Sequence, residues 1–98
     1  MSELKKGLEP LYGERLKGLY LFGSYARGEA REEADLDVLI VVDEIASYTD
    51  EVQRTSEFVS QVSLDSGISV SRVFVSDAAW NFESSPFLEN VREEAIAA

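Results

Sequence analysis

The first apolar residues of the chain are spaced as they would be on one face of a helix. Leu4, Leu8 and Leu11 recur at intervals of three to four residues, which predicts an opening amphipathic helix. Pro10 removes a backbone donor, so we expect it to kink this helix or to mark a restart. Gly13 then provides a stop.

Two apolar runs follow, with a polar segment between them. Leu16–Phe22 predicts a buried strand that ends at Gly23. Leu36–Val42 is almost continuously β-branched or Leu, which is typical of a central strand covered on both faces. Asp37 is the one polar residue inside it, and a carboxylate in a buried strand calls for a reason. The segment 26–34 is too polar for the core, and we expect a turn of helix and a loop there.

The second half of the chain predicts a helix, a strand and two further helical segments. The longest helix should run from the cap Ser47 to Gly67. Residues 68–75 alternate between apolar and polar, which predicts a third strand, parallel to the second because a helix intervenes. A short helical turn should reach Trp80, and the last helix should begin at Pro86.

This order of elements predicts an α/β (α+β) fold with a small mixed three-stranded sheet and flanking helices. The first two strands are expected to be antiparallel. Ninety-eight residues fit one domain, which we place at residues 1–98.

The composition excludes several classes of chemistry. The chain has no Cys and no His, which excludes disulfides, thiolate nucleophiles and a His general base. Only oxygen ligands remain for a metal, and these favour a hard cation, Mg²⁺ or Mn²⁺.

The charge bears on the class of partner, and the hydropathy bears on the location of the protein. A net charge of −10 disfavours a nucleic-acid partner, because it repels phosphate groups. The N-terminus lacks an apolar signal region, and no stretch is long enough to span a membrane, so we expect a cytoplasmic protein.

Candidate chemistry gathers around a Gly-Ser turn and an Asp-x-Asp pair. Asp35 and Asp37 are two residues apart, so on a strand their carboxylates point to one face and can bind one cation. If the turn at Gly23 and Ser24 opens a short helix, its N–H groups can bind a phosphate. Arg27 either reaches that phosphate or is a solvated helix residue. The competing interpretation is that Ser24 is only a cap and the Asp pair only a turn residue and a strand-edge charge.

The spacing from Gly23-Ser24 to Asp35-x-Asp37, framed by two apolar strands, resembles the nucleotidyltransferase superfamily related to DNA polymerase β. In length the chain is similar to its minimal, antitoxin-type single-domain members. The resemblance implies that Gly23 and Ser24 hold the phosphates of a nucleoside triphosphate, for which ATP is the favoured choice. It also implies that Asp35 and Asp37 are catalytic and bind Mg²⁺ or Mn²⁺, and that AMP is transferred to a hydroxyl.

One feature of that family is missing from the sequence. Active members place a third carboxylate on the third strand, where this chain has Ser69, Ser71 and Arg72. We take Ser71 as a possible third-strand position of the site, and Arg72 as a group that could neutralise the Asp pair. Turnover is then expected to be weak or absent, unless a partner completes the site.

The resemblance also implies a protein partner. Minimal members often pair with a small helical HEPN-domain protein, which they mask or modify with AMP. The first hypothesis is therefore an AMP-transferring enzyme, and the alternative is a catalytically degenerate binding module that neutralises its partner by contact. A nucleotide sensor is a third possibility. The aromatic residues Trp80, Phe82 and Phe87 could stack on a base, but we favour a core or partner-interface role for them.

Overall fold

The computed structural model describes residues 2–31 and 34–98. Its elements in chain order are α1 (Ser2–Tyr12), the 3-10 turn η1 (Gly13–Arg15), β1 (Leu16–Phe22), β2 (Leu36–Val42), α2 (Tyr48–Ser66), β3 (Val70–Ser76), α3 (Asp77–Phe82), α4 (Pro86–Glu94) and β4 (Ile96–Ala97). The α/β class expected from the sequence is confirmed.

The sheet is mixed, with the strand order β3-β2-β1-β4. β1 pairs with β2 antiparallel, and β2 pairs with β3 parallel, both as predicted. The expectation of three strands is wrong, because β4 adds a fourth strand against Tyr20 and Leu21 of β1. A strand of two residues is too short to show a periodicity in the sequence.

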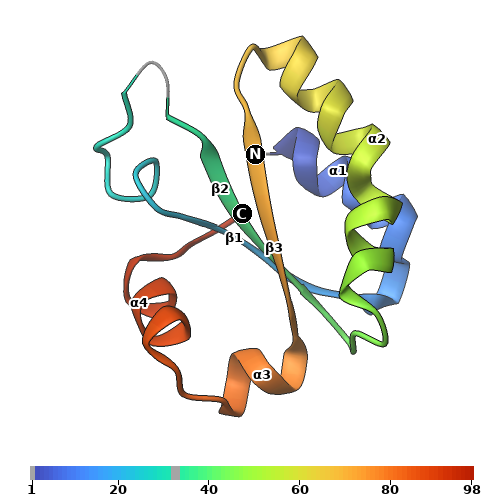
Figure 1. The fold of residues 1–98 in the computed structure, drawn as a ribbon, viewed down its shortest axis with the longest axis vertical. Helices are drawn as coiled ribbons and strands as arrows, with labels where there is room; N and C mark the ends of the chain where they lie inside the picture. The colour runs from blue at the N-terminus through green and yellow to red at the C-terminus, as the bar shows by residue number, and fades with distance from the viewer. Residues whose placement is uncertain (1, 32–33) are drawn as a thin grey trace.

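Helices cover both faces of the sheet (Figure 1). α1 and α2 lie together on one face, and α3 and α4 lie on the other. The strand β2 lies between these layers: Val38 and Ile40 pack toward α1 and α2, while Leu39 and Val41 pack in the second cluster with Val91 of α4. Within the described residues, no helix combines the length and the apolar character that crossing a membrane requires.

Most predicted boundaries agree with the structure. Ser47 accepts the Asp50 N–H and caps α2, which ends at Gly67 in the left-handed region. Of the two alternatives for Pro10, the restart is wrong, because α1 continues through this residue to Tyr12. The loop expected within 26–34 is present, but the described residues of this segment hold turns and irregular chain instead of a turn of helix. Residues 32 and 33 of the segment lie outside the described residues.

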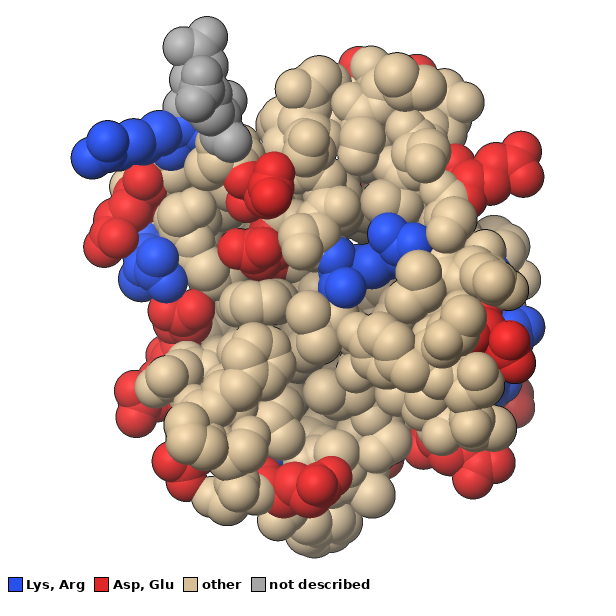
Figure 2. All heavy atoms as spheres, in the orientation of Figure 1, with Lys and Arg blue, Asp and Glu red and all other residues tan. Residues whose placement is uncertain are grey.

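The charged residues are spread over the surface. Figure 2 shows acidic side chains around most of the outline of one face, with basic side chains occurring among them singly or in small groups. On this face no continuous basic patch is seen that could attract a polyanion.

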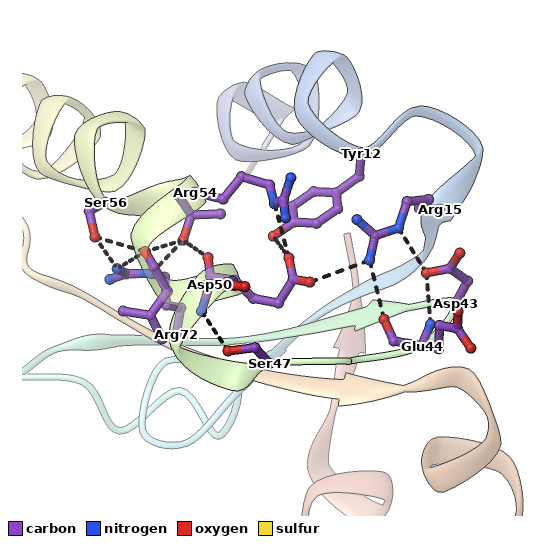
Figure 3. A network of polar contacts seen from close by, with 12 residues as sticks. Tyr12, Arg15, Asp43, Glu44, Ser47, Asp50, Arg54, Ser56 and Arg72 are labelled. Carbon is purple, nitrogen blue, oxygen red and sulfur yellow. Dashed lines mark hydrogen bonds and ion pairs between the residues drawn. The ribbon is translucent and has the colours of Figure 1, made fainter.

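A buried carboxylate, Glu51, ties α2 to the N-terminal part of the chain. Its residue is only 3% exposed, and it accepts hydrogen bonds from the Tyr12 hydroxyl at 2.8 Å, Arg54 at 3.2 Å and Arg15 at 3.3 Å. Figure 3 shows Tyr12, Arg15 and Arg54 converging on this point. Burial by itself raises the pKa of Glu51, but the hydrogen bonds from Tyr12 and Arg15 outweigh it, so its pKa is lowered. The ionised form is therefore the native one.

We predict that Glu51→Gln destabilises the fold by about 1–3 kcal/mol at neutral pH, because the buried Tyr12 hydroxyl and the two arginines lose a charged acceptor. Since folding lowers this pKa, the stabilisation is present above the ordinary value of 4.5 and is lost as pH falls through the lower native value. Urea unfolding at several pH values measures this difference. Glu57→Gln, an exposed site on the same helix, is the control and should change little. Equal stability of wild type and Glu51→Gln at pH 7 would contradict the prediction.

Candidate functional site

The end of β1 and the start of β2 bring Gly23 and Asp37 into contact. Phe22 pairs with Asp37 across the antiparallel ladder, so Gly23 follows directly beside the carboxylate. Gly23 has φ = 75°, and a Cβ at this position would overlap Asp37 Oδ2. Both the backbone conformation and the close approach therefore require glycine. The carboxylate of Asp37 lies against the backbone of the turn.

The chain after Gly23 forms hydrogen-bonded turns. The Arg27 N–H donates to Gly23 O at 3.1 Å, and the Glu29 N–H donates to Ser24 O at 2.9 Å. No helix begins at Ser24, so the expected helix N-terminus is replaced by a compact turn of the backbone. Any anion bound here would be held by individual N–H groups and by side chains.

The two aspartates differ in their environment. Asp35 is exposed just before β2, and Asp37 is half-buried within it. Burial raises the pKa of Asp37, and the charge of Asp35 raises it further, while Arg27 acts in the opposite direction. Two carboxylates in this arrangement destabilise each other when both are ionised, and a bound cation would relieve that repulsion. Their oxygens are the ligand type that Mg²⁺ and Mn²⁺ prefer.

The third strand places Ser71 beside this pair. β3 runs parallel to β2 with Ser71 in register with Asp37, whereas Arg72 is in register with Val38 and lies on the opposite face. Arg72 donates to the Thr55 hydroxyl of α2 at 2.8 Å (Figure 3). The idea that Arg72 neutralises the Asp pair is therefore wrong. Within 2–31 and 34–98, no group of three Asp, Glu, His or Cys side chains is arranged to hold a metal ion.

Glu94, which sequence analysis did not select, contacts two residues of the candidate site. Its Oε2 accepts from Arg27 Nη1 at 3.0 Å, and its Oε1 accepts from the Gly23 N–H at 3.0 Å. Arg27 also pairs with Glu29 at 3.2 Å. The Arg27 guanidinium and then the Gly23 N–H lower the pKa of Glu94. Seventy-one positions separate Glu94 from Gly23, and no local pattern signals such a contact.

The three aromatic residues have different surroundings. Trp80 packs on Tyr20 with ring centroids 4.8 Å apart, and Phe87 meets Phe22 edge to face at 5.9 Å. Trp80 thus packs against the buried cluster that includes Val91 of α4. Phe82 is 85% exposed, which leaves its ring available for contact with another molecule.

Known proteins resemble this chain over most of its length. The nucleotidyltransferase domain family matches residues 1–96. A candidate protein adenylyltransferase of Methanocaldococcus jannaschii is 33% identical over 95 residues, covering 96% of this chain and 89% of that protein. The protein adenylyltransferase MntA of Thermococcus cleftensis is 49% identical over 43 residues, 44% of this chain and 41% of that one.

A solved structure confirms the fold. A chain from the crystal structure of a toxin–antitoxin with AMP-PNP superimposes with a TM-score of 0.72 and 18% sequence identity, covering 98% of this chain and 69% of that chain. At this level of identity the likeness concerns the arrangement of helices and strands.

We predict that Asp37→Asn raises the melting temperature by a few degrees at neutral pH. Folding raises the pKa of Asp37 above its ordinary 3.8, so its ionised form destabilises the native state. The gain should be full above the native pKa and vanish below pH 3.8. Asp35→Asn should give a smaller rise, because it removes the repulsion but leaves the half-buried charge. Thermal unfolding without added metal measures both, and a lower melting temperature for Asp37→Asn would refute this account.

Proposed function

The chain belongs to the nucleotidyltransferase domain family, and from this premise we propose that it transfers AMP from ATP to a hydroxyl group of a partner protein. The observation that carries the proposal is the contact of the Asp37 carboxylate with the backbone of Gly23. It brings a candidate cation ligand and a candidate phosphate-binding turn to one point. The names of the two relatives, a candidate protein adenylyltransferase and the protein adenylyltransferase MntA, support AMP as the transferred group.

The phosphates would be bound by the turn after β1. The Gly23 N–H and the Arg27 guanidinium already bind one anionic group, the carboxylate of Glu94, so their donors point to a common position. Ser24 would add its hydroxyl beside them. Backbone N–H groups and arginine are the donors that proteins commonly use for phosphate oxygens.

Asp35 and Asp37 would hold Mg²⁺ or Mn²⁺ together with phosphate oxygens of the nucleotide. The cation would supply positive charge against the negative charge that develops during transfer. In the reaction the acceptor oxygen bonds to the α-phosphorus, and the bond from that phosphorus to the bridging oxygen breaks. Pyrophosphate leaves, and the hydroxyl proton passes to solvent or to a base that the partner provides.

A second candidate function follows from Ser71, the β3 residue beside Asp37. A serine there cannot act as the third carboxylate that active relatives are expected to have. In this alternative the chain is a degenerate binding module, an antitoxin that neutralises its partner by contact. A small, basic, helical HEPN-type protein would suit either function, because opposite charge speeds and orients association with a chain of −10.

We predict that transfer of labelled α-phosphate from ATP to the partner, with Mg²⁺ or Mn²⁺, falls at least about 100-fold in Asp35→Asn and Asp37→Asn. The assay takes the product of the neighbouring gene as the candidate partner, and the other three ribonucleoside triphosphates test the choice of base. Asp65→Asn on α2 is the matched control. Labelling that survives both substitutions would overturn the assignment of Asp35 and Asp37. A stable complex without labelling would support the binding module.

We predict that Gly23→Ala weakens ATP binding at least about tenfold, because its methyl group would push the Asp37 carboxylate away from the turn. Gly28→Ala separates this effect from backbone strain: Gly28 has a similar φ of 70°, but no atom lies within 4 Å of its added Cβ. It should lose about 1–2 kcal/mol of stability and keep its affinity for ATP. Calorimetric titration measures the affinities, and equal losses in both variants would show that the Asp37 contact is irrelevant.

A further inference from the structure

Glu94 uses both of its carboxylate oxygens on the candidate site. Each oxygen accepts one hydrogen bond at 3.0 Å, from the Gly23 N–H and from Arg27 Nη1. The side chain is 25% exposed, so it lies at the rim of the site and water can reach it. Because water can solvate it, the Glu94 carboxylate does not depend on these two hydrogen bonds. The buried carboxylate of Glu51, in contrast, does depend on its hydrogen bonds.

The two donors that bind Glu94 are the ones assigned above to a phosphate. A carboxylate and a phosphate both present adjacent anionic oxygens, and both favour backbone N–H groups and arginine. We propose that the Glu94 carboxylate occupies the position of a nucleotide phosphate at the Gly23 turn, so that a nucleoside triphosphate binds only by displacing it. This inference depends on the proposed function, because it assumes that the turn binds phosphate.

The backbone around Glu94 is fixed on both sides. α4 ends at this residue, and two positions later Ile96 and Ala97 pair with β1, where the Ala98 N–H also donates to Leu19 O at 2.9 Å. The carboxylate can therefore leave the turn by rotation about its own side-chain bonds, without unfolding α4. Such an internal competitor lowers the apparent affinity for nucleotide in proportion to the time it occupies the site.

A different role would be that of the missing third metal ligand. Two observations argue against it: both oxygens of Glu94 are engaged by donors, and the described residues hold no group of three side chains arranged around a metal. The two roles predict opposite effects of removing the carboxylate, since a metal ligand would strengthen nucleotide binding and a competitor weakens it.

The experiment is a calorimetric titration of Mg-ATP into wild type, Glu94→Gln and Glu94→Ala. We expect the Kd to fall about tenfold in Glu94→Ala and by less in Glu94→Gln, which can still accept the Gly23 N–H. Glu93→Gln, an exposed neighbour that removes the same charge, should leave Kd unchanged. In an Arg27→Ala background the gain from Glu94→Gln should shrink, because the two residues share one interaction.

Each outcome decides the proposal. If wild type binds Mg-ATP and the Glu94 variants bind it equally or more weakly, Glu94 is no competitor, while the proposed function stands. If Glu93→Gln tightens binding as much as Glu94→Gln, the effect is one of net charge and the proposal is wrong. If no variant binds Mg-ATP, the proposed function and this inference fail together.

Discussion

The burial of β2 on both faces is the constraint on which the rest of the molecule depends. Five consecutive residues of this strand, Val38–Val42, are almost inaccessible to water, and each belongs to one of two packed clusters. A strand packed in this way cannot slip by one residue, because slipping would exchange its two faces. The register with β1 and β3 is therefore fixed, and with it the position of Asp37 between Gly23 and Ser71. The packing of β2 in the core thus determines where the residues of the candidate site lie relative to one another.

Glu51 is buried and Asp37 is half-buried, and the pKa values of these two carboxylates are shifted in opposite directions. Glu51 is surrounded by donors, and its pKa is lowered, which is the signature of an anion that the fold has satisfied. Asp37 is half-buried beside a second carboxylate, and its pKa is raised, so the fold leaves its charge incompletely compensated. A half-buried carboxylate whose charge the fold leaves uncompensated is a candidate ligand for a cation. This contrast is an argument for the candidate site that does not depend on resemblance.

Sequence analysis could predict the elements whose signals are local. The bounds of β1 and β2, the caps Ser47 and Gly67 and the parallel third strand were all predictable, because periodicity and capping act over a few residues. What could not be predicted depends on the tertiary structure. β4 is a strand only because β1 offers it an edge, and Glu94 reaches Gly23 only after the whole sheet has formed. The direction of Arg72 was also open until the register showed which face of β3 it occupies.

In the proposed function the site would hold a nucleotide but lack a group for activating an acceptor, and each of these two expectations has a structural cause. The donors and the Asp pair lie on the end of β1, the turn and the start of β2, all fixed by the central strand. The position that would complete the site belongs to β3, where Ser71 is exposed at the edge strand of the sheet. An edge strand is the part of a sheet that a second protein can approach. In the proposed function, a partner bound there would bring both its hydroxyl group and an additional carboxylate to Asp37, so that the acceptor itself would complete the site. Under this arrangement a nucleotide held by the chain alone would react slowly, and specificity for the acceptor would follow from the geometry of the complex.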